Sequence, residues 1–388
     1  MKHSTFHVEM IRARDLDSFM CDYVRDGEVQ QISPISRYRA IAQSNNPHAD
    51  PDDIGLLLGY FGETCVGYQG VLPGLLRTKR GLGKVYWCTA AYVLPEFRKR
   101  MVTIHLLKKL MSLGKDIVST GFNKVGGDVL RGLHFQELPP LEYLTLRLDR
   151  LDFLGHPFQR FYRLQKRWPA LERISQAALR RTRRYFYPSA RRTYYRIVAD
   201  RADTFLRGAR WREDTCVDQN TVESDRKCDS QACFERGPEV INWMLRYPWI
   251  RDRVATFPPY YFTEAYEQFR YTVLTLEEAG TKRPGFVVLS SSLEKGISKL
   301  KVLDLYCREE EEQTISWLIL RQAAQLQADE IELPLRLKSS LKSVPLAAFL
   351  AKREQRRYLC HPGSDTSPLS EFIPEIRLDL CDGDCAFT

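Results

Sequence analysis

The chain lacks long apolar runs. None of its 388 residues belongs to an uninterrupted apolar stretch of about 18 residues, the shortest length typical of a membrane-spanning helix. The first residues also lack the apolar core of a secretory signal. We therefore expect a cytoplasmic protein that does not cross a membrane.

Cysteine occurs ten times, but no Cys-x-x-Cys pair is present. Cys360-His361 and Cys381-x-x-x-Cys385 combine metal-binding residue types, although neither has the usual spacing of a structural zinc site. Without a secretory signal, reduced thiols are the default. We therefore expect free thiols and no metal centre.

Two common catalytic motifs are missing. Gly81-Leu82-Gly83-Lys84 lacks the spacing of a P-loop and precedes a strand instead of a helix. No Ser/His/Asp or Cys/His arrangement stands in a recognisable context. The sequence therefore does not indicate a P-loop nucleotidase or a triad hydrolase.

Positive charge is concentrated in one segment. Residues 155–212 hold 16 Lys or Arg and 3 Asp or Glu, a local net charge of +13 against +9 for the whole chain. The remainder is therefore net acidic. Local basicity describes a segment's partner and not its fold. The segment reads as a solvated helical arm that also suits a substrate diphosphate, an anionic membrane surface or a nucleic acid, of which we least expect nucleic acid.

The order of predicted elements occurs twice, over residues 54–148 and 268–380. Each run reads strand, turn, strand, strand, helix, strand, helix, strand. Such a repeat predicts two similar α/β domains. We expect them at residues 1–150 and 236–388, joined by a basic helical arm and linker at 151–235.

Individual elements follow from periodicity and from stop signals such as Pro95. Helices are expected at residues 15–25, 97–113, 125–133, 158–166, 170–184, 240–247, 309–326 and 341–350. Strands are expected at residues 5–12, 54–61, 65–72, 84–94, 117–120, 142–148, 268–276, 285–291, 299–307, 331–333, 357–359 and 376–380.

The informative stretch follows the strand at residues 84–94. Pro95 ends this strand, and the basic run 98–100 leads into a helix with an apolar stripe that begins at Val102. The first turn of a helix leaves about four backbone N–H groups unpaired and carries a partial positive charge. Together with adjacent arginines, such a turn cradles a pyrophosphate.

This pattern resembles the acyl-coenzyme A signature of the GNAT acetyltransferase superfamily. The matching residues are Val93, Pro95, Glu96 and Arg98, followed by an amphipathic helix. The resemblance implies an α/β (α+β) fold of two tandem GNAT-like domains, each with a mixed, mostly antiparallel sheet flanked by helices. It also implies acyl-CoA as co-substrate, either acetyl-CoA or a longer acyl form. It covers residues 5–148 well and 236–388 only through element order.

The resemblance assigns cofactor-binding roles around the motif. In the family, the last strand residues pair with the pantetheine arm, the next loop wraps the pyrophosphate, and an asparagine follows later. Carried over, these roles fall on Ala91, Val93, Arg98, Lys99, Arg100, Met101, Val102, Thr103 and Asn123.

The chain departs from the family pattern at four positions. Met101 and Thr103 stand where the loop has small residues, and side chains there crowd a phosphate although the N–H groups remain. Leu130 stands near the place of the tyrosine that protonates the leaving thiolate, which leucine cannot do. His134 replaces the glycine before Phe135. Whether the cofactor site functions therefore stays open.

The second run contrasts with the first. After the strand at 299–307, its helix opens with the four glutamates 309–312. Glutamates suit the positive end of a helix but repel a pyrophosphate. We therefore expect that the C-terminal domain does not bind the cofactor and instead walls the acceptor site. A structural dimerisation domain is the alternative.

Acylation of an amine needs a base, which often acts through water. The strand at 84–94 offers no acid or histidine. His134 and Asp304 are the residues we name as catalytic candidates, and Glu63 on a turn is a third. A structural role for each stays open, as does catalysis by positioning alone.

The acceptor is suggested by resemblance alone. Tandem GNAT proteins of this length resemble bacterial sugar N-acyltransferases, and segments 241–243 and 247–249 fit that group. The implied acceptor is a small-molecule amine such as a nucleotide-linked amino sugar. The aromatic run 258–262 and the turn Asp382-Gly383-Asp384 suit such a ligand, with a packed linker and a turn that buries Phe387 as the structural alternatives.

A second function stays open beside the enzyme. In it, a non-catalytic GNAT-like protein binds an anionic membrane surface or nucleic acid through the basic arm. Peripheral membrane contact and a homodimer are likewise left open by the sequence.

Overall fold

The structure is a computed structural model that forms two compact units. Unit 1 consists of Met1–Leu141, Thr215–Phe269 and Gln355–Thr388, and unit 2 consists of Glu142–Asp214 and Arg270–Glu354. The residues that the structure describes are 5–25, 32–148, 169–218, 232–252, 260–262, 265–277 and 285–385.

Unit 1 is built around a mixed sheet that has eight strands among the described residues. The order is β1-β2-β3-β4-β5-β17-β6, and β9 pairs with β3; only β4 and β5 run parallel. The strands are β1 (Phe6–Arg12), β2 (Ile54–Phe61), β3 (Thr64–Thr78), β4 (Gly81–Val93), β5 (Asp116–Thr120), β6 (Gln136–Glu137), β9 (Cys233–Phe234) and β17 (Tyr358–His361).

The helices of unit 1 begin and end at readable signals. Pro95 stops β4 and opens a 3-10 turn, and Ser36 caps a helix by accepting a hydrogen bond from the N–H of Arg39. The helices are η1 (Ala13–Asp15), α1 (Leu16–Arg25), α2 (Arg37–Ser44), η2 (Pro95–Arg100), α3 (Val102–Met111), α4 (Lys124–Gly132), α7 (Pro238–Arg246), α10 (Pro368–Phe372) and η8 (Ile373–Glu375). A small parallel pair joins β10 (Arg251–Asp252) to β11 (Ala265–Tyr266).

The core of unit 1 lies under α3. Val102, Leu106, Leu107 and Leu110 form the buried stripe of this helix. They belong to one apolar cluster with the inner residues of β2, β3 and β4. This apolar stripe holds α3 against the sheet. The helix starts shortly after β4 ends, with η2 between them.

Unit 2 has a seven-stranded sheet among its described residues, in the order β16-β7-β15-β14-β13-β12-β8, with β14 and β15 parallel. The strands are β7 (Leu141–Arg147), β8 (Arg210–Asp214), β12 (Gln268–Glu277), β13 (Phe286–Glu294), β14 (Ile297–Tyr306), β15 (Glu330–Pro334) and β16 (Ala351–Arg356). The helices are α6 (Pro169–Leu206), η5 (Glu309–Glu311), α8 (Glu312–Leu326), η6 (Leu335–Lys338), η7 (Ser340–Ser343) and α9 (Ala347–Leu350).

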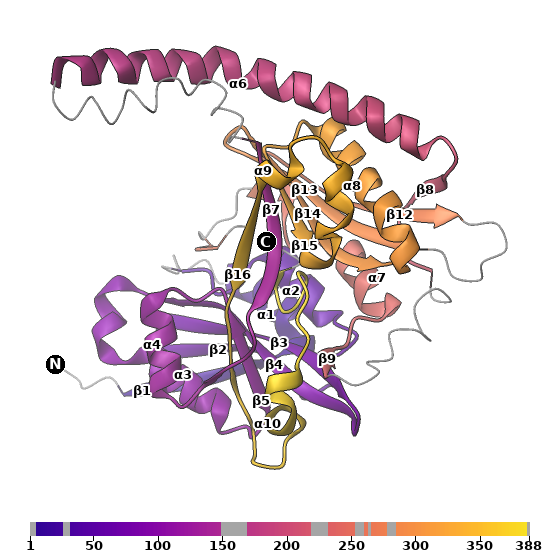
Figure 1. Cartoon of the computed structure of the whole chain (residues 1–388). Helices are drawn as coiled ribbons and strands as arrows, with labels where there is room; N and C mark the ends of the chain where they lie inside the picture. Colours follow the sequence, from indigo (N-terminus) through magenta and orange to yellow (C-terminus); the bar gives the residue numbers. More distant parts are fainter. Residues whose placement is uncertain are drawn as a thin grey trace. The chain divides into compact units, whose positions relative to one another are not determined.

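The final strand of each sequence run lies in the sheet of the other unit. β7 belongs to the first run but pairs antiparallel with β15 of the second. β17 belongs to the second run but pairs antiparallel with β5 and β6 of the first. In Figure 1, β7 runs in magenta beside the gold β16. The runs therefore exchange strands, and each sheet needs both halves of the chain.

The expected fold class is confirmed: the molecule is α/β, with two mixed, mostly antiparallel sheets flanked by helices. The compact units, however, are not consecutive along the chain, whereas the expected domains at 1–150, 151–235 and 236–388 are. The difference arises because strand pairing carries residues 142–147 into unit 2 and residues 355–388 into unit 1.

The second half of the basic segment is not a solvated arm. From Tyr194 to Leu206, α6 packs on α8 within unit 2 (Figure 1), and Tyr194, Tyr195 and Val198 are buried. The Tyr195 hydroxyl donates to the carbonyl of Ala328 at 2.7 Å. Because apolar residues recur along one face of the helix, this part belongs to the core of unit 2. The expected helix at 158–166 lies outside the described residues.

Two local expectations were wrong, and one helix was missed. Residues 376–380 form no strand and take part only in an isolated bridge between Cys233 and Arg377. Residues 341–350 form a 3-10 turn and then the short α9 instead of one helix. α2 was not expected, because its buried positions include polar Arg39 and Gln43 in place of an apolar stripe.

The described residues contain neither a membrane-spanning helix nor a metal-binding cluster. No helix among them combines the length and the hydropathy that a membrane crossing requires. No group of three or more His, Cys, Asp or Glu side chains in the same residues is arranged to hold a metal ion.

Candidate functional site

A β-bulge distorts the end of β4. The register with β3 slips between Gln69 and Val71, because Thr89 and Ala90 together stand opposite Gly70. The buried Gln69 amide stabilises the bulge by donating to the carbonyls of Thr89 at 2.7 Å and Gly70 at 2.8 Å. A bulge bends its strand and increases the local twist.

Beyond the bulge, β4 continues without β5. The parallel pairing joins residues 85–88 to residues 116–119 and then stops, although β4 runs on to Val93. No other described strand pairs with this edge of β4. The last five residues of β4 therefore present an edge that is not covered by strand hydrogen bonds.

Ala91 and Val93 direct their backbone groups toward this edge. The N–H of Leu94 donates across to β3, at the carbonyl of Val66, at 2.9 Å. Backbone groups of successive strand residues point to opposite sides, so those of Val93 and Ala91 point away from β3. An extended ligand with amide groups can pair with such an edge as an added strand does.

The basic turn follows directly. η2 carries Arg98, Lys99 and Arg100, which are exposed. The Nε of Arg98 donates to the carbonyl of Val93 at 3.2 Å, which holds the guanidinium beside the open edge. The Arg100 guanidinium lies 5.2 Å from the ring centroid of Phe61, a cation–π distance that anchors its stem.

The first turn of α3 presents backbone N–H groups that no carbonyl of the same helix can accept from. Met101 precedes the helix in the left-handed conformation (φ 57°) and supplies no side-chain cap. The first bond into the helix runs from the N–H of His105 to the carbonyl of Met101 at 3.1 Å. The N–H groups of Val102, Thr103 and Ile104 belong to the first turn of α3, and the first turn of an α-helix has no carbonyl of its own helix to accept from such groups. These donors and the helix dipole form an anion site.

The side chain of Met101 is 59% exposed and so does not fill the turn. Thr103 is half-buried. The two residues that depart from the small-residue pattern therefore lie at the start of α3, and Met101 does not cap the helix with its side chain. The left-handed backbone at Met101 explains why a loop of this geometry favours glycine at that position.

Asn123 and His134 lie at opposite ends of α4. The Asn123 side chain accepts a hydrogen bond from the N–H of Gly126 at 2.8 Å and so caps the helix. His134 follows the helix in the left-handed conformation (φ 64°), the usual position of a glycine cap. Leu130 is buried in the core. Both polar residues thus have local structural roles at the helix ends.

The sheet of unit 2 also has a bulge and a strand that runs past its neighbour. The register between β13 and β14 slips by one residue before Asp304, and β14 pairs with β15 only at residues 299–301. Here side chains bond both backbone groups of Leu305 at the edge. The Arg336 guanidinium donates to the carbonyl of Leu305 at 2.9 Å, and Asp304 accepts from the N–H of Leu305 at 2.7 Å.

The helix that follows β14 is capped and acidic. The buried Glu311 carboxylate accepts from the backbone N–H of Arg308 at 2.7 Å and from its guanidinium at 2.9 Å. Glu309 and Glu310 stand beside it on the exposed side. Asp304 belongs to this unit and His134 to unit 1, so the two catalytic candidates lie on different compact units.

Sequence reasoning missed a cluster around Arg39 in unit 1. The guanidinium lies 4.1 Å from the ring centroid of Trp249, donates from Nη1 to the Tyr260 hydroxyl at 3.2 Å, and is 3.6 Å from the Asp384 carboxylate. The aspartate turn and the aromatic run had been noted, but the helix that carries Arg39 had not. A buried Ser36 cap before Arg37 was the available signal.

Aromatic rings connect this cluster to β4. Tyr68 lies 6.5 Å from Tyr260 and 6.1 Å from Tyr92 between ring centroids, and Tyr92 lies 4.3 Å from Tyr261. The Arg98 guanidinium is 6.0 Å from the Tyr92 ring. The chain of rings therefore leads from the basic turn along β4 to Arg39. Pro258 and Pro259 of the expected aromatic run lie outside the described residues.

Cys88 stands directly before the bulge. Burial, and to a smaller extent the charge of Asp384, raises the pKa of its thiol to about 12. The thiol therefore stays protonated at neutral pH and does not serve as a nucleophile.

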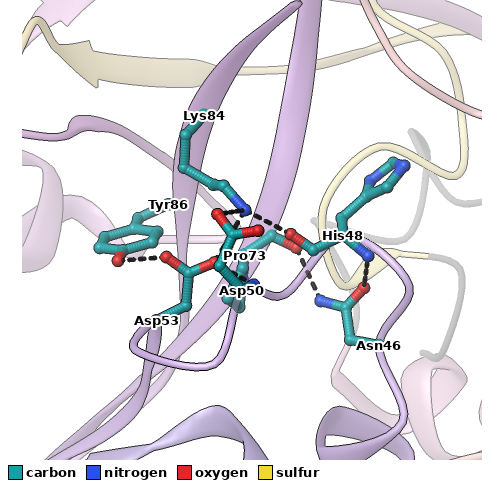
Figure 2. A network of polar contacts seen from close by, with 7 residues as sticks. All are labelled: Asn46, His48, Asp50, Asp53, Pro73, Lys84 and Tyr86. Carbon is teal, nitrogen blue, oxygen red and sulfur yellow. Dashed lines mark hydrogen bonds and ion pairs between the residues drawn. The ribbon is translucent and has the colours of Figure 1, made fainter.

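A second polar network supports β4 at its other end (Figure 2). The Lys84 ammonium donates to the carbonyl of His48 at 2.6 Å and pairs with Asp50 and Asp53 at 2.8 Å each. The Tyr86 hydroxyl donates to Asp53 at 2.7 Å. Lys84 had appeared in the failed P-loop comparison, and here it ties the loop before β2 to β4.

Comparisons with known proteins identify similar folds only. No protein-family model matches the chain, and no curated protein matches it. Similar solved structures include a GCN5-related N-acetyltransferase from Anabaena variabilis, with 10% identity over 93% of this chain and 73% of that chain and a TM-score of 0.45. A GCN5-related N-acetyltransferase from Kribbella flavida has 12% identity over 92% and 71%, with a TM-score of 0.42.

A third similar structure is a conserved protein from Enterococcus faecalis described as a probable N-acyltransferase. It has 9% identity over 92% of this chain and 72% of that chain, with a TM-score of 0.47. Similarity at this level assigns no residue of this chain a role.

Proposed function

We propose that unit 1 binds acyl-coenzyme A and that the protein transfers the acyl group to an amine. One observation carries the proposal: the uncovered edge of β4 past its bulge leads directly to a basic 3-10 turn and to the start of α3, which has no side-chain cap. An amide-containing arm that ends in a pyrophosphate matches this order of donors and charge.

The residues present fit the cofactor. Ala91 and Val93 would pair with the pantetheine amides, and Val102 to Ile104 would donate to the pyrophosphate, with Arg98 to Arg100 adding charge. Bound there, the thioester supplies an acyl carbon that a neutral amine can attack. The Asn123 side chain caps α4, so we propose that it positions this helix and does not contact the cofactor.

The second copy is proposed not to bind the cofactor. At its equivalent edge, side chains bond both the carbonyl and the N–H of Leu305, whereas Arg98 in unit 1 bonds the carbonyl of Val93. Its helix start is also capped by Glu311. The exposed Glu309 and Glu310 repel an anion. Asp304 at this edge, His134 and Glu63 remain the proposed sources of the base that takes the proton from the amine.

The acceptor within this proposal is a small-molecule amine. A nucleotide-linked amino sugar is the form that the sequence resemblance suggests. Its diphosphate would need basic side chains, and on α6 the Arg191 side chain is already paired with Asp329.

The test is calorimetric titration with acetyl-CoA. Arg98→Glu is expected to weaken binding at least tenfold, about 1.4 kcal/mol, because it places a negative charge beside the pyrophosphate. Glu309→Lys combined with Glu310→Lys should leave the affinity unchanged. Arg80→Glu, an exposed arginine of unit 1 at the far end of β4, is the control for a general charge effect.

Two results would count against the proposal. Absence of acetyl-CoA binding to the unmodified protein at millimolar concentration would remove the enzymatic function. A change in affinity in the Glu309 and Glu310 variant but not in Arg98→Glu would show that the two copies have been assigned the wrong way round.

A further inference from the structure

Arg39 is a buried cation with few hydrogen bonds. It is 6% exposed, and its Nη2 has no hydrogen-bond partner among the residues that the structure describes. Its Nη1 donates to the Tyr260 hydroxyl at 3.2 Å. Removing an ion from water carries a large penalty unless it is paired and hydrogen-bonded. A guanidinium with donors left over is therefore suited to a further acceptor.

The partner of Arg39 is itself incompletely engaged. Asp384 Oδ2 lies 3.6 Å from Arg39 Nη2, within ion-pair range but longer than a hydrogen bond. The Asp384 side chain is 21% exposed, so the pair meets solvent on the aspartate side. Together the two groups present one positive and one negative charge a few ångströms apart.

The turn that carries Asp384 is firmly placed. Asp382 is buried and pairs with Arg236 at 3.1 Å. Gly383 adopts φ 73°, and a Cβ there would lie 2.9 Å from the Trp87 ring, so the turn sits tightly on β4. The contacts of Asp382 and Gly383 therefore hold the backbone of Asp384 in place.

The pair lies beside the proposed reaction site. Tyr68 stacks on Tyr260, which accepts from Arg39, and Tyr68 also faces Tyr92 on the uncovered part of β4. The Tyr68 hydroxyl and the Thr89 hydroxyl at the bulge are buried and have no partner within the described chain. Two buried hydroxyl groups without a described partner thus lie on β3 and β4 close to the bulge.

We infer that Arg39 and Asp384 bind a zwitterionic amine of the amino acid type, with its carboxylate on the Arg39 guanidinium and its ammonium group on Asp384. As the identity of the acyl acceptor, the inference rests on the proposed function; as a binding site, it stands separately. The planar guanidinium fork matches a carboxylate. A phosphate dianion would be repelled by Asp384, whereas a zwitterion balances both charges.

The test uses three forms of each probe. The twenty common L-amino acids, their N-acetyl derivatives and their decarboxylated amines are titrated calorimetrically into the full-length protein, with and without coenzyme A. At least one amino acid is expected to bind tenfold or more tightly than its decarboxylated amine. Phenylalanine, N-acetylphenylalanine and 2-phenylethylamine form one such set.

Two variants separate binding from structure. Arg39→Met should weaken the N-acetyl amino acid at least tenfold and leave the amine unchanged, whereas Asp384→Asn should do the reverse. A purely structural pair would weaken both ligands together. Arg39→Lys, which keeps the charge but loses the fork, is the milder variant if Arg39→Met does not fold. Arg77→Met removes another ion pair of unit 1 and serves as the control.

The outcomes distinguish this inference from the proposed function. If no amino acid binds, or if glucosamine 6-phosphate binds instead in an Arg39-dependent way, the inference is wrong even when acetyl-CoA binds. If amino acids bind with the two opposite losses but acetyl-CoA does not bind, the site stands and the acyltransferase function fails.

Discussion

Met101, directly before α3, has a φ of 57°, a left-handed backbone conformation that residues other than glycine rarely adopt. A left-handed residue with a Cβ costs about 1–2 kcal/mol. The strained residue joins the basic 3-10 helix η2 to α3, directly before the first turn of α3. Strained residues of this kind cluster at functional sites.

Replacing Met101 tests both its strain and its position. Met101→Gly should keep or raise the free energy of unfolding and increase acetyl-CoA affinity, because it relieves the backbone and removes a side chain beside the pyrophosphate. Met101→Val should lower the free energy of unfolding by about 1 kcal/mol, because a branched Cβ fits the left-handed region worst. Urea unfolding and calorimetry measure the two effects. Weaker acetyl-CoA binding in Met101→Gly would contradict this placement.

At the residue scale, the sequence carries little sign of backbone conformation. The spacing of Leu106 and Leu110 predicted a helix over residues 97–113, but α3 begins only at Val102 because residues 95–100 form η2. The left-handed φ of Met101 and of His134 could not be foreseen. Methionine and histidine usually adopt other backbone conformations, so neither residue type indicates a left-handed one. Arg39 was missed because a buried arginine looks like a surface one in sequence.

At the element scale, the loop between α2 and β2 depends on the Lys84 network (Figure 2). His48 lies in this loop, and burial lowers the pKa of its imidazole from 6.5 to about 4. The folded protein thus resists protonation of His48, whereas the unfolded chain accepts the proton near its ordinary pKa. The stabilisation is therefore complete above pH 6.5 and is lost as pH falls toward 4.

His48→Gln should reduce the pH dependence of stability. In the unmodified protein, this histidine accounts for a loss of up to about 3 kcal/mol in the free energy of unfolding between pH 7 and pH 4. The variant retains the backbone carbonyl that accepts from Lys84 but has no titrating ring. Urea unfolding at several pH values measures the slope, with His7→Gln, an exposed histidine, as the control. An identical slope in His48→Gln would refute the assignment.

The elements that the sequence predicted best were those with a strong stripe or a stop residue. β4 was located by its apolar run and by Pro95. Its bulge at Thr89 and Ala90 was invisible, because an apolar strand that is buried on both faces has no alternation for a bulge to interrupt. α2 was missed for the opposite reason: it buries polar side chains.

At the scale of the whole molecule, the exchange of β7 and β17 makes the two sheets interdependent. Gly363, just after β17, packs against the backbone that leads into β5. A Cβ at this position would lie 2.4 Å from the carbonyl oxygen of Gly114. Tyr358-Leu359-Cys360 is a short apolar strand that would suit either sheet. The sequence therefore predicted the strand but not its destination.

The exchange predicts that the expected domains do not fold separately. A fragment of residues 1–150 lacks β17, and a fragment of residues 236–388 lacks β7 and α6. Neither should show a cooperative urea transition alone, whereas the fragments 1–218 and 232–388 produced together should associate and show one. Cooperative unfolding of fragment 1–150 on its own would contradict the strand exchange.

The central claim is that an acyl-coenzyme A molecule lies along the uncovered end of β4 and against the start of α3. Amide hydrogen exchange with and without acetyl-CoA tests it most directly. The account predicts slower exchange at residues 91–93 and 102–104 when the ligand is present, and no change at residues 302–312. Protection confined to residues 302–312, or absent from both segments at saturating ligand, would contradict it.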